Sequence, residues 1–426
     1  MKKIFQLLLS ATLLLTVASC SEDEKFTESI FDTSIQSVDN SSATAPFDQW
    51  LYDNFVVPYN TEIQYKFNYT ASNLSYQLAP SDYKKSQLLA HFIKYLFYDV
   101  YDKYGEKDHN GNPIFMKTYG PRIFHFIGSS QSNPTTGTEV LGYASAGVKI
   151  TLIKVNEMRS VTNGMNFTDE DIDNLNQYQF HTMHHEFSHI LHQTKTYPVS
   201  FGQVTPSTYD GRTWQDRDSC DSHSLGYLTQ YGSSAIYEDF VETLSCTITD
   251  TDDRWMNTII EGCLNGGVKA GDKELIYALI DSLEIDNFDD PNKHWNNFSI
   301  FEETYKNSET GEASHSRYIL DTHLEDSQSH LKSNLTDDEY KKYQGYNVPD
   351  TTFTSFRDFL DKWVTYDTSD EIKGINAMLK KIDIASKWYT ENYGIHLFTI
   401  RREVDARQKA INDYINSDEC IIYDYQ

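Results

Sequence analysis

The stretch His181–Gln193, "HTMHHEFSHILHQ", holds five histidines and one glutamate within thirteen residues. His185 and His189 are four residues apart, so on a helix their rings lie on one face, one turn apart, where both can bind one metal ion. Glu186 follows the first of them and points to the flank of such an ion, where a carboxylate can take a proton from water. "HEFSH" therefore fits the HExxH pattern of two zinc ligands and a general base.

The other histidines of this stretch are poor candidates for a third ligand. His192 lies nearly two turns from His185, which is far from an ion already held by the HExxH pair. His184 is rotated by about 100° around the helix, and His181 lies one turn earlier. We expect these three side chains to pack or to contact the ligands. The longer metzincin pattern needs glycine at position 192 and histidine at position 195, where the chain has His192 and Lys195, so that class is excluded.

A catalytic zinc ion needs a third protein ligand and one open position for water. The stretch "QYGSSAIYEDFVETLSC" at residues 230–246 contains a predicted helix over Ala235–Thr247. Glu238 and Glu242 stand four residues apart on one face of that helix. One of them can bind the metal while the other hydrogen-bonds a histidine ring and fixes its tautomer. Asp239 points elsewhere, and we expect it at the surface or in a helix cap.

Tyr231 lies seven residues before Glu238, on the loop that enters the same helix. A phenol there can donate a hydrogen bond to the oxyanion formed when water attacks a carbonyl. "HEFSH" followed by "YGSSAIYEDFVE" resembles the glutamate-zincin pattern of anthrax-lethal-factor-type metalloproteases. This resemblance implies that Tyr231 stabilises the transition state, that Glu238 is the third ligand, and that Glu242 supports a ligand histidine from behind.

A second resemblance covers most of the chain. It is to a family of Bacteroidota lipoproteins described as zinc metallopeptidases, or substrate-import-associated zinc metallohydrolases, found beside TonB-dependent importers. It implies Zn²⁺ as cofactor, a protein or peptide substrate and an importer system as partner. Ser188 departs from the alanine or glycine common in such motifs, but it is small enough to fit. The segments that carry the resemblance are "FDQWLYDNFVVPYNTEIQYKF", "FIGSS", "LGYASAGVKITLIKVN", "HHEFSHILHQ", "YEDFVETLS" and "KIDIASKWYTENYGIHLFTIRREVDAR".

The first residues of the chain predict export and lipidation. Lys2 and Lys3 precede an apolar run that is too short to span a membrane and is shaped like a secretory signal, which we place at residues 1–19. The run ends in "VASC", which looks like a bacterial lipobox with Cys20 as the lipidated residue. The acidic "SEDEK" at residues 21–25 resembles the signal that sends Bacteroidota lipoproteins to the cell surface, although a solvated tether has the same composition. We expect an outer-membrane lipoprotein, exposed at the cell surface and attached by its lipid alone.

The net charge limits which binding partners we expect, and the cysteine spacing limits which disulfides and metal sites can be predicted. The 426 residues carry 36 Lys and Arg against 63 Asp and Glu, a formal net charge of −27. So acidic a surface repels nucleic acid and anionic lipid, and we expect neither as a partner. An oxidising compartment permits disulfides, but the spacing of the four other cysteines favours no pairing and no zinc site. These cysteines are Cys220, Cys246, Cys263 and Cys420.

Hydrophobic periodicity predicts both helices and strands, with a helical C-terminal portion. Together with the resemblances above, this implies an α+β fold: a zincin-like metalloprotease domain with a mixed sheet and an HExxH helix, followed by that helical portion. Apolar spacing predicts helices over Ser86–Val100 and over Ile375–Trp388, the latter capped by Gly394. A further helix begins at Thr168 and leads into the HExxH stretch. The predicted organisation is a signal peptide (1–19), a lipidated flexible tether (20–45), a catalytic region (46–285) and a mainly helical region (286–426) that is either separate or part of the catalytic domain.

Two β-rich runs, Arg122–Ser130 and Gly147–Val155, are predicted strands. The second alternates Lys149, Thr151 and Lys154, which suits a half-exposed edge strand that pairs with an extended peptide, but an ordinary interior strand fits as well. The leading functional hypothesis is a zinc metallopeptidase that cleaves protein or peptide at the cell surface in support of nutrient import. The alternatives are a zinc hydrolase acting on amide or acyl groups of glycans, and a non-catalytic substrate-binding lipoprotein that uses the abundant aromatic residues for stacking.

Overall fold

The computed structural model of the protein describes residues 38–68, 78–132, 139–140, 142–145, 149–160, 166–264 and 374–425, with short strands between residues 268 and 367. The predicted signal peptide, Cys20 and the acidic segment behind it lie outside the described residues. In the described part of the chain, no helix is long and apolar enough to cross a membrane.

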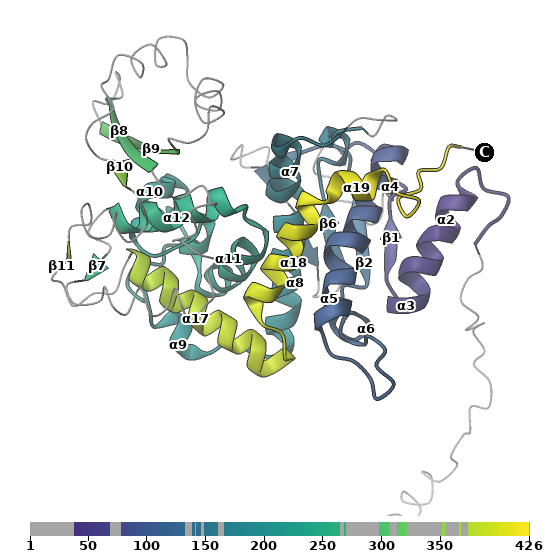
Figure 1. Cartoon of the computed structure of the whole chain (residues 1–426), viewed down its shortest axis with the longest axis horizontal. Coiled ribbons are helices and arrows are strands. Elements are labelled where there is room, and N and C mark those ends of the chain that lie inside the picture. Colours follow the sequence, from purple (N-terminus) through teal and green to yellow (C-terminus); the bar gives the residue numbers. More distant parts are fainter. Residues whose placement is uncertain are drawn as a thin grey trace, which may run out of the picture.

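A small mixed sheet lies beside the N-terminal helices (Figure 1). Its order is β1–β2–β6–β5. The first three strands run parallel, and β5 pairs antiparallel with β6. The two strands predicted from the β-rich runs are confirmed as β2 and β6. The bounds are β1 (Glu62–Gln64), β2 (Ile123–Phe126), β5 (Gly142–Ser145) and β6 (Lys149–Leu152).

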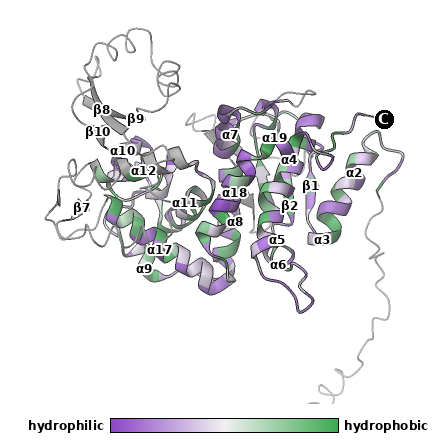
Figure 2. Cartoon of the chain, viewed as in Figure 1, coloured by the Kyte–Doolittle hydropathy of each residue, from purple (hydrophilic) through white to green (hydrophobic). Residues whose placement is uncertain are grey.

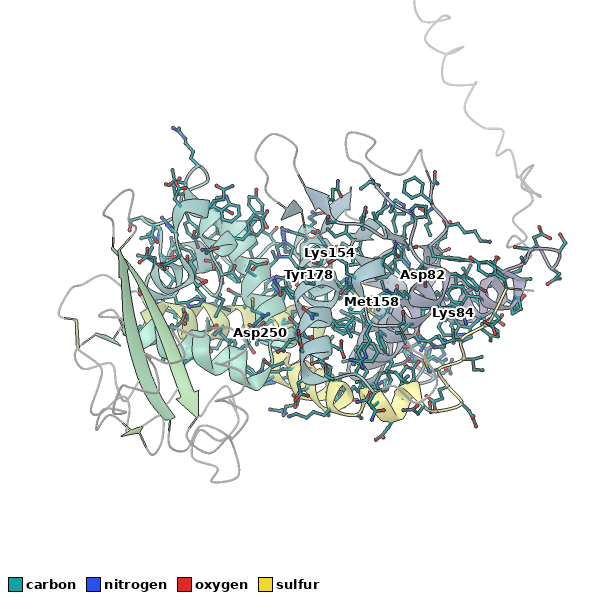
Figure 3. All side chains as sticks on the ribbon, turned by 90° about the horizontal axis from the view of Figure 1, so that it is seen from above. Asp82, Lys84, Lys154, Met158, Tyr178 and Asp250 are labelled. Carbon is teal, nitrogen blue, oxygen red and sulfur yellow. The ribbon has the colours of Figure 1, made fainter. Side chains whose placement is uncertain are left out.

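Of the two alternatives left open for Gly147–Val155, an edge strand or an interior strand, the structure has the interior strand. β6 is paired on both sides, with β2 and with β5, and the outer strands of the described sheet are β1 and β5. Lys154 does not belong to the strand either. It follows β6 in a left-handed conformation (φ 58°), is buried, and its Nζ lies 4.0 Å from the centre of the Tyr178 ring (Figure 3). Polar alternation along one strand does not reveal its neighbours, so strand order could not be deduced from it.

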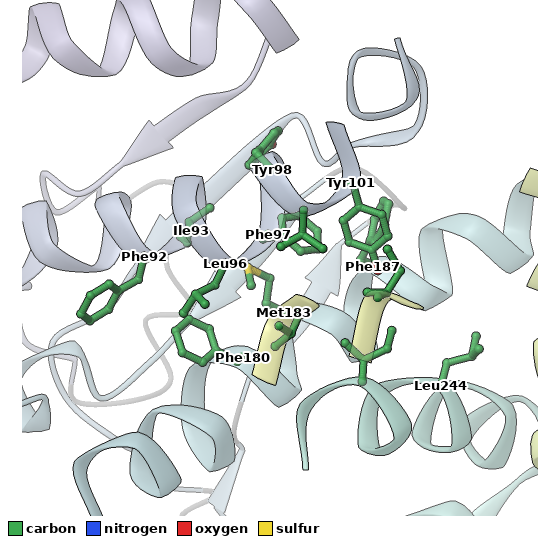
Figure 4. Packing of buried hydrophobic residues seen from close by; sticks show 14 of the residues in the cluster. Phe92, Ile93, Leu96, Phe97, Tyr98, Tyr101, Phe180, Met183, Phe187 and Leu244 are labelled. Atoms are coloured by element: carbon green, nitrogen blue, oxygen red, sulfur yellow. The ribbon is translucent and has the colours of Figure 1, made fainter. Parts of the chain in front are cut away.

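A long helical segment covers one face of the sheet. It consists of α4 (Tyr83–Ile93), η2 (Lys94–Tyr98) and α5 (Asp99–Tyr104), which confirms and extends the helix predicted over Ser86–Val100. Asp82 caps its start by accepting a hydrogen bond from the backbone N–H of Lys85 at 2.9 Å. Phe97 and Tyr101 of this segment pack against Phe187 of the HExxH helix (Figure 4).

The HExxH stretch lies at the end of a second long helical segment. It runs through α7 (Asp169–Leu175), η4 (Asn176–Phe180) and α8 (His181–Thr194). The predicted start is confirmed as a capping box: Thr168 Oγ1 accepts from the Asp171 N–H, and the Asp171 carboxylate accepts from the Thr168 N–H. The π-helical η4 directly precedes the histidine-rich turns, a local irregularity that often accompanies functional sites.

The helix that carries Glu238, the candidate third ligand, packs between the HExxH helix and the C-terminal helices. α11 (Ile236–Thr249) packs against α8, and α17 (Gly374–Tyr393) and α18 (Leu397–Lys409) pack against α11. The predicted C-terminal helix is confirmed, and Gly394 ends it with a φ of 68°. Figure 2 shows hydrophobic and hydrophilic residues mixed along α17, as expected of an amphipathic helix with one buried face.

The region after residue 285 is not helical throughout. A three-stranded antiparallel sheet of order β10–β8–β9 lies within it, and periodicity did not predict it. Its strands are β8 (Phe298–Lys306), β9 (Ala313–Asp321) and β10 (Thr352–Phe353).

α12 (Asp252–Leu264) lies next to the start of α17, although more than a hundred residues separate them in the sequence. The two helices approach closely at Gly262, where an added Cβ atom would lie 2.9 Å from Met378 Sδ and 3.4 Å from the backbone nitrogen of Ile375.

The remaining helices of the described chain are α2 (Ala45–Leu51), η1 (Tyr52–Val56), α3 (Val57–Tyr59), α6 (Phe115–Tyr119), η3 (Val155–Glu157), α9 (Val199–Gly202), η5 (Trp214–Asp216), α10 (Ser219–Ser224), η6 (Tyr231–Ser234) and α19 (Ile411–Ile415). The remaining strands are β3 (Gln131–Ser132), β4 (Glu139–Val140), β7 (Val268–Lys269) and β11 (Tyr366–Asp367).

Candidate metal centre

Three of the predicted ligands meet between α8 and α11. Nε2 of His185 and Nε2 of His189 each lie 3.3 Å from Oε2 of Glu238. The three ligand atoms are all within 4.8 Å of one another, and the side chains are nearly buried. The convergence expected from the sequence, two histidines one helical turn apart and a glutamate from a later helix, is therefore present.

The spacing of these atoms fits a zinc ion. Two ligand atoms bound tetrahedrally at about 2.0–2.1 Å from zinc are about 3.3 Å apart. The buried Glu238 Oε2 makes no hydrogen bond of normal geometry among the described residues, although both imidazoles are near it. Two nitrogens and one carboxylate oxygen are also a donor set that zinc prefers in hydrolases. The three residues present therefore fit a zinc ion.

Glu242 holds the first ligand histidine in place. Its Oε1 accepts a hydrogen bond from His185 Nδ1 at 2.5 Å and from His181 Nε2 at 3.0 Å. The first bond places the proton of His185 on Nδ1 and leaves Nε2 free for a metal. Burial alone would raise the pKa of Glu242, but His181 and His185 outweigh it and hold the pKa well below its usual value. Glu242 is thus an ionised acceptor.

His192 takes the same role for the second ligand. His189 Nδ1 lies 2.9 Å from His192 Nε2, so His189 donates when its own Nε2 faces the metal. Burial lowers the pKa of His192 to about 4, which keeps its ring neutral and able to accept. The two ligand histidines are therefore supported differently, one by a carboxylate and the other by a neutral imidazole.

The three remaining histidines, His181, His184 and His192, each pack in the core or contact the residues of the candidate site, as expected from the sequence. His181 contacts Glu242, and His192 contacts a ligand directly. His184 points away from the ligands, and its ring packs against Phe97 while its Nδ1 lies 3.3 Å from the Tyr101 hydroxyl. It belongs to the core.

Tyr231 and Glu186 lie next to the ligands. Tyr231, on η6, has its ring centre 5.9 Å from that of His185. Burial and then the negative charge of Glu238 raise the pKa of Tyr231 well above its usual value, so the phenol keeps its proton and can donate. Glu186 is buried on α8, one residue after the first ligand.

Thr229 is a functional candidate that the sequence did not reveal. Its hydroxyl donates to Glu242 Oε2 at 2.6 Å and accepts from the backbone N–H of Gly232 at 3.0 Å. It thereby links the carboxylate behind His185 to the turn that carries Tyr231. Nothing in the spacing pointed to it, because a threonine two residues before the tyrosine fits no ligand pattern.

The expectation for Asp239 is wrong. Asp239 is buried, and its Oδ2 lies 2.7 Å from Lys381 Nζ and accepts a hydrogen bond from the Tyr209 hydroxyl at 2.6 Å. Lys381 belongs to α17, far along the chain, so local periodicity could not identify the partner.

A second group of possible ligands, His181, Glu242 and Cys246, also has its ligand atoms within 4.8 Å of one another. Because His181 and Glu242 already bond to each other and Glu242 bonds to His185, we assign this group to the support of the first. Cys246, Cys263 and Cys420 are buried and free, and the side chain of Cys220 lies outside the described residues.

Residues 40–289, well over half of the chain, match a protein family described as "Putative zinc-binding metallo-peptidase". The chain belongs to this family. Zinc is accordingly the metal of this chain, and the resemblance to a family of zinc metallopeptidases, stated from the sequence, is confirmed. The matched span includes all three ligands, Glu186 and Tyr231.

The chain is also similar in fold to a solved structure. That structure is titled a putative zinc-binding metallo-peptidase from Bacteroides caccae, with 20% sequence identity and a TM-score of 0.51. The similarity covers 92% of this chain and 100% of the other. No curated protein matches the chain. The likeness supports an α+β fold of the metallopeptidase kind that extends past the span of the family match.

Proposed function

We propose that this protein is a zinc-dependent peptidase with a zincin-like catalytic region, in which the HExxH helix supplies two ligands and a later glutamate the third. The observation that carries the proposal is the meeting of Glu238 Oε2 with the Nε2 atoms of His185 and His189 at 3.3 Å. These residues come from two helices that pack side by side in the core, so the meeting is a property of the fold.

The residues around the ligands have distinct tasks in amide hydrolysis. A zinc ion held by His185, His189 and Glu238 supplies Lewis acidity, which acidifies water and polarises a carbonyl. Glu186 accepts the proton of the attacking water and passes it to the leaving amine. Tyr231 donates a hydrogen bond to the developing oxyanion.

We propose that a peptide substrate binds along strand β5. An extended peptide can add to an outer strand of a sheet through backbone hydrogen bonds, and β5 is one of the two outer strands of the described sheet. β5 and β6 both contact α8, which brings this edge next to the ligand helix. This assignment replaces β6, whose two sides are already paired.

The proposed setting is the cell surface, in support of nutrient import. It rests on the apolar leader, the lipobox ending in Cys20 and the acidic "SEDEK" behind it. A lipid-anchored peptidase there would cut protein or peptide for an importer of the TonB-dependent class. A non-catalytic binding lipoprotein would have no need of Glu186, and the intact base favours the enzyme.

Replacing Glu186 by glutamine tests the proposal. We expect Glu186→Gln to bind one zinc ion per chain, as the wild type does, and to lose about 10²–10⁴-fold in kcat because the general base is gone. The measurements are metal content after dialysis and cleavage of a mixed peptide library followed by mass spectrometry.

A matched control is Glu391→Gln, which changes an exposed glutamate on α17 and should leave both zinc content and turnover unchanged. Wild-type activity in Glu186→Gln would rule out this base. Failure of the wild-type protein to bind zinc would rule out the proposed function as a whole.

A further inference from the structure

The first turn of α11 exposes apolar side chains beside the metal centre. Tyr237 is 48% exposed and Ile236 38% exposed, whereas every residue from Glu238 to Thr249 is buried. A helix that is otherwise internal therefore opens to solvent only at the two residues that directly precede a metal ligand.

Aromatic rings flank both ligand histidines. The ring centre of Tyr237 lies 6.1 Å from that of His189. On the other side, Tyr231 lies 5.9 Å from His185 and is itself backed by Trp214 at 5.1 Å. Since Tyr231 has a place in the proposed chemistry, Tyr237 and Ile236 are the exposed apolar groups that the chemistry leaves without a task.

Exposed large hydrophobic side chains are few in the described structure, and some of them cluster near the metal centre. Among the described residues, seven large hydrophobic side chains are exposed, and three of them fall between residues 231 and 237. The chain as a whole has a net charge of −27. Clustered exposed apolar groups on a polar surface mark binding sites, and this cluster is continuous with the ligands.

We propose that Tyr237 forms one wall of an apolar subsite that binds an aromatic or large aliphatic side chain of a peptide substrate, at a residue directly beside the scissile bond. The proposal rests on the peptidase function above and adds the class of substrate. An apolar side chain placed there covers the exposed ring of Tyr237 and removes apolar surface of both partners from water. An acidic side chain would gain nothing there and would stand close to Glu238.

The experiment uses two peptides that differ at one position. A library digest with wild-type protein first identifies the cleaved bond, and peptides with phenylalanine or alanine beside that bond are then compared. We expect wild type to prefer phenylalanine by about tenfold or more in kcat/KM. Tyr237→Ala should lose most of this ratio while still binding zinc, and Tyr237→Phe should keep it.

A matched control is Tyr425→Ala. Tyr425 is also an exposed tyrosine, but it stacks on Tyr83 of α4, close to the C-terminus, which lies at one edge of the molecule and away from α11 in Figure 1. We expect the preference for phenylalanine to be unchanged in this variant.

A binding measurement separates this proposal from the proposed function. In zinc-loaded Glu186→Gln, we expect the phenylalanine peptide to bind more tightly than the alanine peptide, and Tyr237→Ala in this background to remove the difference. If wild type cleaves no peptide but this binding pattern is found, the subsite is supported and the peptidase function is wrong.

Three results would overturn the subsite. One is an unchanged preference for phenylalanine in Tyr237→Ala, and another is a wild-type enzyme indifferent to the flanking side chain. The third is a loss of binding to chitin or xylan oligosaccharides in Tyr237→Ala with peptide binding intact, which would make the ring a glycan-stacking surface.

Discussion

At the scale of single residues, helix geometry made the ligand pair predictable. The four-residue spacing of His185 and His189 determines that their rings share a face, whatever surrounds them. Each ring also donates a hydrogen bond to an acceptor behind it. For His185 the acceptor is Glu242 on α11, and for His189 it is His192, one turn further along α8. The resemblance predicted the role of Glu242. It did not predict the hydrogen bond of His192 to His189, because residue spacing alone cannot distinguish a side chain that contacts a ligand from one that packs in the core.

Thr229 offers a test of how the turn bearing Tyr231 is held. Thr229→Val keeps the shape of the side chain and removes the hydroxyl that bonds Glu242 and Gly232. We expect kcat to fall about 10-fold or more, in the range found for supports of metal sites, with KM changed less and zinc still bound. Thr229→Ser should recover most of the loss. Steady-state kinetics and metal analysis measure both.

The same substitution in a Tyr231→Phe background shows what Thr229 acts on. If Thr229 positions the phenol, its removal costs little once the phenol is gone, so the two losses are not additive. Equal fold-losses in the two backgrounds would contradict this role and assign Thr229 to the metal ligand alone.

At the scale of helices and strands, amphipathic periodicity and capping residues predicted the long helices, including the capping box at Thr168 and the cap at Gly394. They left open whether β6 is an edge strand or an inner strand, and they wrongly placed Asp239 at the surface or in a helix cap. Both shortcomings have one cause. Periodicity reports which face of an element is buried, but not which element covers it, and pairing across long stretches of chain leaves no local trace.

The buried pair between α11 and α17 predicts a large loss of stability. Lys381 and Asp239 are both almost fully buried, and their charged atoms are 2.7 Å apart. Lys381→Met leaves the carboxylate without its cation, and we expect the free energy of unfolding to fall by about 3–5 kcal/mol. Urea denaturation measures it.

Two further variants make that test specific. Lys381→Met combined with Asp239→Asn removes both charges and should cost clearly less than the single change. Lys387→Met removes an exposed pair with Asp383 on the same helix and should cost no more than about 1 kcal/mol. A single Lys381→Met variant as stable as Lys387→Met would show that the buried pair contributes little.

At the scale of the whole molecule, the last residues of the chain are bound to its first helices. His91 of α4 lies 3.2 Å from the Tyr414 hydroxyl through Nδ1 and 3.0 Å from the Ile421 carbonyl oxygen through Nε2. Burial lowers the pKa of His91 to about 4. The ring is therefore neutral in the folded protein at pH values where it is already protonated in the unfolded chain.

This difference predicts acid sensitivity. Between the unfolded pKa of about 6.5 and the folded value the unfolded chain binds more protons, so stability is complete above about pH 6.5 and falls as the pH drops toward 4. We expect His91→Gln, which cannot be protonated, to reduce the loss of unfolding free energy between pH 7 and pH 4.5 by about 2 kcal/mol.

Urea titrations of both proteins in the presence of EDTA measure this without a contribution from metal release. Part of the pH dependence should remain, because burial also lowers the pKa values of His125 and His184. An unchanged pH dependence in His91→Gln would mean that this histidine is not the one that titrates.

The adjacency of Gly262 and Met378 has a consequence for how such a protein can vary. The segment that connects α12 to α17 therefore starts and ends at two neighbouring points of the described helices. The entropy of closing a connection between two such points grows only slowly with its length, so we expect residues added to or deleted from this segment to cost little through chain closure alone. We expect a variant in which a short linker joins α12 to α17 to keep the ligand-bearing helices α8 and α11 folded, and its zinc content measures this.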